Sequence, residues 1–421
     1  MLPFRSRSLG PLLLVLLILA ACTPAATPTA PPAQQGTQQP AQEVSSEATV
    51  YKIGVLTAIT GKAAFLGEPE RDAAVMLQEH LDAQGGIVGP DGVRHRVEIL
   101  IHDSEGNGDV AIPVAKKLID DEGVVALVGD STSPVTMALV PVVQEAQVPL
   151  LSMASSSAIV EPVEERAWVF KSAQSNEHTA PWQVRYVKGK GLTRVANFYV
   201  NDAYGEDGRD GIRAAAAEMG ITIVLEETFN ASDTDMTAQL TRLRASDAEA
   251  LLVTAIPPAA AVLTKQFREM GLTIPIIHNH GIGMKPFIDL CGADVAEGVL
   301  FPMGKMVAVD ALPDDDPQKA VLSDFMADFE ASTGTPPSTF AGHAWDALLI
   351  ALRGLEKLPN GLSLEEQRAG LRDEIEKVQG LVGTGGVFNL SPDDHVGLSV
   401  DDVVMARITN GEWEYFPPEA W

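Results

Sequence analysis

The sequence predicts an α/β fold in which parallel β-sheets are covered by helices on both faces. From Tyr51 onward, short runs of β-branched and other apolar residues alternate with amphipathic stretches. These runs are apolar almost without interruption, which is typical of strands buried on both faces of a parallel sheet. The chain has 421 residues, of which 46% are hydrophobic, so it is long enough for two domains with cores of their own.

The predicted elements follow one another as strand and helix along the body of the chain. The expected strands are residues 52–56, 97–101, 124–128, 148–151, 195–200, 221–225, 250–253 and 274–277. Apolar residues at helical spacing predict a helix over 72–83, and Gly85-Gly86 marks its end. The same pattern predicts a helix over 109–120 that stops before Gly123.

Composition and motifs exclude several classes of function. The formal charge of −27 opposes binding to nucleic acids and to anionic lipid surfaces. Two cysteines rule out a disulfide framework and a thiolate-rich metal cluster. The chain has no Gly-x-Ser-x-Gly elbow, no Gly-Lys-Ser phosphate loop and no dinucleotide-binding glycine fingerprint. We therefore expect a protein that is not an enzyme and carries neither cofactor nor metal.

The first 22 residues have the pattern of an export signal. Arg5 and Arg7 precede the apolar run 12–19, and the stretch is too short to span a bilayer as a helix. It ends in Leu19-Ala20-Ala21-Cys22, which resembles the lipobox of bacterial lipoproteins. The resemblance implies a signal peptide over 1–21, cleavage before Cys22 and a lipid on its sulfur. The alternative is an ordinary signal peptide with a chance cysteine.

A segment rich in Pro, Ala, Thr and Gln follows the signal. Residues 22–49 offer almost nothing to bury, so we expect a disordered tether. Such a tether would hold a soluble body away from a membrane surface.

Small polar sequences follow three of the expected strands. They are Thr57-Ala58-Ile59-Thr60-Gly61, Gly129-Asp130-Ser131-Thr132-Ser133 and Ser152-Met153-Ala154-Ser155-Ser156-Ser157. In open α/β sheets, ligands bind beyond the carboxyl ends of the strands. Serine hydroxyls and free backbone amides at helix starts suit an anion there. Each serine taken singly is also explained as a helix cap.

These turns, in their order and spacing, resemble the leucine/isoleucine/valine-type periplasmic binding proteins of ABC transporters. The resemblance covers roughly residues 50 to 415 and also rests on Gly67-Glu68, Gly85-Gly86-Ile87, Tyr204-Gly205-Glu206-Asp207-Gly208, Gly220, Gly271 and Ala296-Glu297-Gly298-Val299. It implies a periplasmic binding protein fold of type I, with two Rossmann-like lobes joined by three hinge crossings. The N-terminal lobe would hold 50–173 and 304–395, and the C-terminal lobe 174–303 and 396–421.

The resemblance also implies a ligand pocket between the lobes. Ser133 falls where the family places a hydroxyl on the ligand carboxylate, and Ala154 where a backbone carbonyl takes the ammonium. Ser155 and Ser156 would complete the carboxylate site with a main-chain amide and a hydroxyl. Tyr204 matches the tyrosine that the second lobe places over the ligand, although it could instead pack on a neighbouring strand.

Three further expected pocket residues bear on the identity of the ligand. Leu66 stands where branched-chain binders have an aromatic residue, and Ile256 completes the expected set. His280 stands where those proteins have the glutamate that neutralises the α-ammonium. A buried ammonium without a carboxylate is costly, so either another acid such as Asp130 replaces it or the ligand lacks that amine. His278 and His280 alone do not make a zinc site, because no third ligand has suitable spacing.

Together these features predict a lipid-anchored, extracytoplasmic solute-binding component of an ABC transporter. It would capture a small amino acid, amide or carboxylate as a monomer and deliver it to a permease. The alternatives are a ligand sensor with the same fold and, more remotely, a secreted hydrolase.

Overall fold

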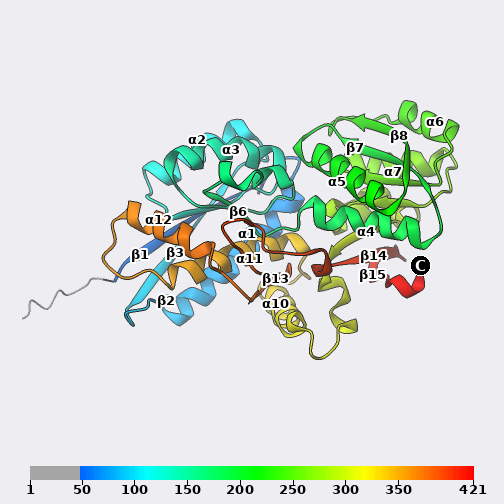
Figure 1. Ribbon diagram of the computed structural model, residues 1–421. Coiled ribbons are helices and arrows are strands. Elements are labelled where there is room, and N and C mark those ends of the chain that lie inside the picture. The colour runs from blue at the N-terminus through cyan, green and yellow to red at the C-terminus, as the bar shows by residue number, and fades with distance from the viewer. Residues whose placement is uncertain (1–47) are drawn as a thin grey trace, which may run out of the picture. The chain divides into compact units, whose positions relative to one another are not determined.

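The computed structural model describes residues 48–421 (Figure 1). The expected signal peptide, Cys22 and residues 23–47 of the expected tether lie outside these residues. Within residues 48–421, no helix has both the length and the apolar character needed to cross a membrane.

The first sheet has six strands in the order β2-β3-β1-β4-β5-β6. They are β1 (Val50–Thr57), β2 (Ile87–Val88), β3 (Arg94–Asp103), β4 (Ala126–Gly129), β5 (Leu150–Ser152) and β6 (Val169–Lys171). Neighbours are parallel except β2 and β3. The helices between these strands are α1 (Ala64–Gln84), α2 (Gly108–Asp120) and α3 (Ser133–Ala146). β4 and β5 are buried along their whole length, as expected for central parallel strands.

The second sheet has seven strands in the order β15-β14-β11-β10-β9-β7-β8. They are β7 (Arg194–Val200), β8 (Thr222–Phe229), β9 (Ala250–Thr254), β10 (Ile276–His278), β11 (Leu300–Gly304), β14 (Val403–Thr409) and β15 (Glu412–Tyr415). The helices around it are α4 (Asn176–Gly189), α5 (Ala203–Met219), α6 (Thr237–Ala245), α7 (Ala259–Glu269), α8 (Lys285–Cys291) and α9 (Ala293–Ala296). Figure 1 shows α5, α6 and α7 gathered around β7 and β8.

Three helices that follow β11 of the second sheet in sequence pack in the core of the first sheet. They are α10 (Pro317–Thr333), α11 (Thr339–Leu355) and α12 (Leu364–Ile375), and the small hairpin of β12 (Leu381–Val382) and β13 (Val387–Phe388) follows them. Buried Phe325, Leu348 and Leu371 belong to the same hydrophobic cluster as Ile53 of β1. The chain therefore passes between the two sheets three times, after β6, after β11 and before β14.

The α/β fold class predicted from the sequence is confirmed, and two details differ. Strands β2, β14 and β15 are antiparallel edge additions to the parallel sheets. Helix α1 begins at Ala64 and not at residue 72, with Pro69 inside it. The early turn persists because Gly67 lies directly on the backbone of Ala58, where an added Cβ would stand 2.1 Å from the carbonyl oxygen. That packing outweighs the one helical hydrogen bond that Pro69 removes.

Candidate functional site

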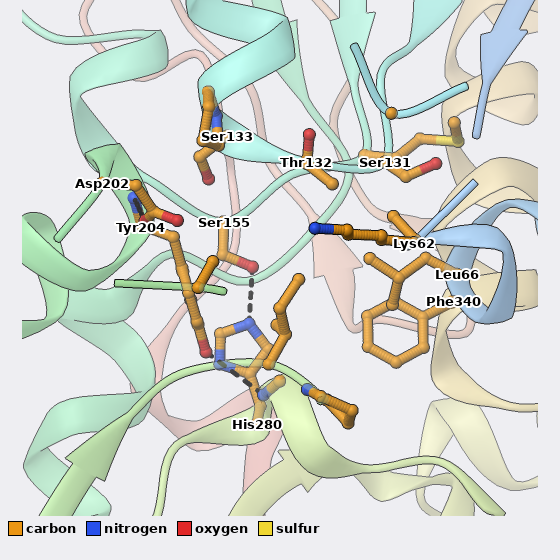
Figure 2. Close-up of a pocket in the computed structure, with 18 of the residues that line it drawn as sticks. Lys62, Leu66, Ser131, Thr132, Ser133, Ser155, Asp202, Tyr204, His280 and Phe340 are labelled. Carbon is orange, nitrogen blue, oxygen red and sulfur yellow. Dashed lines mark hydrogen bonds between the residues drawn. The ribbon is translucent and has the colours of Figure 1, made fainter. Parts of the chain in front are cut away.

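A cavity of ≈ 240 Å³ lies where the carboxyl ends of strands from the two sheets face each other. The loops after β1, β4 and β5 form one wall, and those after β7, β9 and β10 form the other. Figure 2 shows Tyr204 and Phe340 on opposite sides of the view, with Ser155 and His280 between them. The volume lies just below the range of about 300–1,000 Å³ common for drug-sized ligands, which fits a small solute.

Most of the expected pocket residues line this cavity. Those that do are Leu66, Ser133, Ser155, Tyr204, Ile256 and His280. Ala154 and Ser156 are buried behind the wall and do not line it. The backbone amide of Ser156 donates to Ser133 Oγ over 3.1 Å, behind the cavity wall.

Ser133 is the first residue of α3, so its hydroxyl lies at the positive end of a helix dipole. Because Ser133 Oγ accepts from the amide of Ser156, its own proton remains available to an acceptor in the cavity. A carboxylate is the group best matched to a hydroxyl donor at a helix start.

Lys171 carries a buried positive charge beneath the serine turn. Its Nζ donates to the carbonyl oxygens of Ser155 and Ser156, over 2.9 and 3.1 Å, and to Ser175 Oγ over 2.8 Å. Burial lowers the pKa of the Lys171 ammonium to about 8, while Asp207 and Glu177 act in the opposite direction. The group therefore stays mainly charged at neutral pH, holds the turn in shape and favours an anion nearby.

His280 reaches across the cavity to the opposite wall. Its Nε2 lies 2.5 Å from Ser155 Oγ, and its Nδ1 lies 2.7 Å from Asn279 Oδ1 (Figure 2 marks the first contact). Burial lowers the pKa of the imidazole to about 3, and the basic groups His343 and Lys171 add to the effect. His280 is therefore a neutral hydrogen-bonding group at physiological pH.

Tyr204 covers the second wall with its ring 5.8 Å from that of His280, centroid to centroid. Its hydroxyl oxygen accepts the backbone N–H of Gly281 over 3.2 Å. Burial of the ring raises the pKa of the phenol. Gly281 leaves the room that this contact needs, since an added Cβ would lie 2.7 Å from the Tyr204 hydroxyl oxygen.

Asp202 is the one carboxylate among the described residues that line the cavity. Its Oδ1 caps α5 by accepting the N–H groups of Tyr204 and Gly205, over 2.9 and 3.0 Å. Asp130, considered above as a partner for a ligand ammonium, is fully buried and does not line the cavity. Its Oδ1 accepts the amide of Thr132 over 3.0 Å, and burial raises its pKa to about 6.

Glu70 is a second buried acid, behind the first wall. Its Oε2 accepts from Thr57 Oγ1 over 2.5 Å and from the hydroxyl of Ser131, a cavity residue. Burial raises the pKa of the Glu70 carboxyl to about 8, against the effect of these two hydrogen bonds. Glu70 is thus mainly protonated at neutral pH.

His278 lies in the core and, unlike His280, does not line the cavity. His278 Nε2 bonds to Thr264 Oγ1 over 2.9 Å, inside the core, and its ring packs against Phe287. Across residues 48–421, no three His, Cys, Asp or Glu side chains are grouped so as to hold a metal ion.

Several cavity residues were not identified from the sequence. They are Lys62, Ser131, Thr132, Asp202, Gly281 and Phe340, among others. Ser131 and Thr132 belong to a turn already identified as polar, and Asp202 has the spacing of a cap before Tyr204. Phe340 had no such signal, because α11 reaches the cavity only through tertiary packing.

Comparison with known proteins gives one family match and many relatives. Residues 50–412 match the family described as "Periplasmic binding protein". The "Leucine-, isoleucine-, valine-, threonine-, and alanine-binding protein" of Pseudomonas aeruginosa is 23% identical over 316 residues, covering 74% of this chain and 80% of the relative. An "Amino acid binding protein" of the same organism is 28% identical over 282 residues, covering 65% of this chain and 71% of the relative.

Solved structures agree on the fold. An extracellular ligand-binding receptor from Rhodopseudomonas palustris HaA2 superposes with a TM-score of 0.79 at 28% identity, covering 87% of this chain and 99% of that one. A second match is the branched-chain amino acid transporter substrate binding protein LivJ from Streptococcus pneumoniae, in complex with isoleucine. Its TM-score is 0.73 at 24% identity, and the match covers 87% of this chain and 99% of that one. At that identity the second likeness shows the fold alone.

Proposed function

The chain belongs to the periplasmic binding protein family, and on that premise we propose that it is the extracytoplasmic solute-binding component of an ABC transporter of the branched-chain amino acid class. Proteins of this family bind substrates and are not enzymes. One observation carries the proposal: a cavity for a small solute lies between the strand ends of two sheets and is lined from both.

The proposed solute is a small amino acid, amide or carboxylate. The hydroxyl of Ser133 at the start of α3, with Lys171 beneath the neighbouring turn, offers neutral donors in a positive local field. Leu66, Ile256 and Phe340 supply apolar surface for an aliphatic or aromatic portion of the solute.

Transport requires that a permease recognise the loaded protein. We propose that the residues around each sheet form a lobe, 50–173 with 304–395 and 174–303 with 396–421, and that the lobes close over the solute. Closure changes the surface offered to the permease, as in other hinge-closing binding proteins. A lipid on Cys22 would keep the protein, acting as a monomer, at the membrane, with residues 22–49 as the tether.

The proposal is tested by native mass spectrometry of protein purified without refolding. We expect a retained small solute whose mass disappears after partial unfolding, and a Ser133→Ala variant that retains less of it. The identified compound is then supplied to cells with and without the gene, and the cells that lack the gene should take up less of it. If no solute is retained and none binds at millimolar concentration, the proposal fails.

A further inference from the structure

We propose that His280 sets the specificity of the site, and that a hydrogen bond to Asn279 fixes its tautomer. The cavity then prefers a carboxylate whose second polar group is an uncharged donor, such as a 2-hydroxy acid, over the 2-amino acid with the same side chain. This inference rests on the proposed solute-binding function and narrows its ligand.

The orientation of the Asn279 amide is fixed at both ends. Its Nδ2 donates to Asn176 Oδ1 over 2.9 Å, and Asn176 Nδ2 donates in turn to Asp207 Oδ2 and to the Tyr204 carbonyl, over 2.7 and 3.2 Å. Its Oδ1 accepts the backbone N–H of His280, a group that only donates, and the same oxygen faces His280 Nδ1, each over 2.7 Å. The imidazole proton must then sit on Nδ1.

The tautomer decides what His280 offers to the cavity. With the proton on Nδ1, Nε2 is an acceptor, and the contact to Ser155 is a hydroxyl donating to nitrogen. A ligand hydroxyl can replace Ser155 in that role. A ligand group that needs an acidic partner finds none at His280.

The positive charge of Lys171 opposes an ammonium near His280. Burial lowers the pKa of His280 to about 3 and Lys171 adds to the effect, while burial also lowers the pKa values of His343 and His178, to about 3 and 4, so that both are neutral. Asp202 uses one oxygen to cap α5, and Asp130 and Glu70 do not line the cavity. An ammonium bonded to His280 would lose its water and gain no counter-charge from that side chain.

A 2-hydroxy acid matches both ends of the site. Its carboxylate meets the Ser133 hydroxyl and the start of α3, where Lys171 adds positive charge. Its hydroxyl donates to His280 Nε2. Sites that hydrogen-bond one polar group discriminate strongly against an analogue that leaves buried groups badly paired.

The test is isothermal titration of the full-length protein with a matched pair, 2-hydroxy-4-methylpentanoate and leucine. We expect the hydroxy acid to bind at least about tenfold more tightly, which corresponds to about 1.4 kcal/mol. His280→Glu should reverse this preference by supplying a negative charge. Asn279→Leu removes the acceptor that holds the proton on Nδ1, so the preference should shrink even though Asn279 itself does not line the cavity.

A spectroscopic readout separates positioning from general loss of structure. In protein with ¹⁵N-labelled histidine, the His280 signals should show a protonated Nδ1 and a bare Nε2, and Asn279→Leu should mix the two tautomers. The control is Asp207→Asn, because in that variant Asn176 Nδ2 still donates to the Tyr204 carbonyl and Asn279 Oδ1 still accepts the His280 backbone N–H. It should change neither the tautomer nor the preference.

The outcomes distinguish this inference from the proposed function. Tighter binding of leucine than of the hydroxy acid overturns the inference and leaves solute binding intact. Loss of leucine binding in Asp202→Asn would then identify Asp202 as the ammonium partner. If neither compound nor any retained solute binds, the inference and the proposed function both fail.

Discussion

His280 Nε2 lies 2.5 Å from Ser155 Oγ, and this hydrogen bond joins the loop after β10 of the seven-stranded sheet to the loop after β5 of the six-stranded sheet. The two side chains are 125 positions apart in sequence. Both line the cavity, so a solute that bonds to either side chain must compete with this contact. The same hydrogen bond therefore links the two walls of the cavity.

Gly281→Ala should weaken solute binding at least about tenfold while leaving the fold intact. The new Cβ would lie 2.7 Å from the Tyr204 hydroxyl oxygen and 2.9 Å from Ile256 Cγ2, so both cavity residues must move. Overpacking of this kind typically costs about 1–3 kcal/mol. Calorimetric titration with the retained solute measures the effect. Gly108→Ala in α2 is the control, since its Cβ would meet only Ala138 Cβ, at 3.3 Å.

Lys171→Met should lower the free energy of unfolding by about 2–4 kcal/mol. The change leaves the carbonyls of Ser155 and Ser156 and the Ser175 hydroxyl without their buried donor. Urea unfolding measures the loss. Lys188→Met, which alters an exposed lysine of α4, should stay close to the wild type. Equal stability of the two variants would show that the buried ammonium does not hold the turn.

Glu70→Gln should stabilise the protein increasingly as the pH rises from about 5 to 8. The pKa of the buried carboxyl is raised from 4.5 to about 8, so in that window the unfolded chain has released a proton that the folded chain keeps. Raising the pH therefore favours unfolding of the wild type, and the effect levels off above pH 8. Glutamine has no proton to release, so the variant does not lose stability in this way. Its free energy of unfolding should exceed that of the wild type by at most about 5 kcal/mol, at 1.36 kcal/mol per pKa unit.

The measurement for Glu70 is urea unfolding of both proteins at pH 5 and pH 9. Glu68→Gln, at an exposed position of the same helix, controls for the loss of one negative charge. A stability difference between wild type and Glu70→Gln that is the same at both pH values would contradict the assigned protonation state.

Cys22→Ser should release the protein from the membrane fraction without changing solute binding. The cysteine thiol is the expected site of lipid attachment, and serine cannot form the thioether. Fractionation of cells and incorporation of labelled palmitate measure the anchor. Persistence of the variant in the membrane fraction, with palmitate still incorporated, would show that the anchor lies elsewhere.

Much of the fold could be predicted from the sequence, because its signals are local. Apolar runs predict strands such as β7 and β9. Apolar residues at helical spacing, with a glycine after them, predict α2. The start of α1 could not be predicted, since Pro69 favours a later start and only the packing of Gly67 on Ala58 explains the earlier one. The antiparallel strands β14 and β15 likewise depend on a return of the chain from the first sheet.

The sequence by itself determined that this is an α/β protein of the periplasmic binding protein family, with polar turns at the strand ends. The fold class follows from hydrophobic periodicity, and the family follows from the resemblance of short motifs in their order and spacing. Only the tertiary structure decided that Ser133 bonds to Ser156, that Asp130 is buried, that Phe340 reaches the cavity and that His280 Nε2 meets Ser155. The physical reason is that charge state and hydrogen-bond direction depend on burial and on partners distant in sequence, which no local pattern encodes.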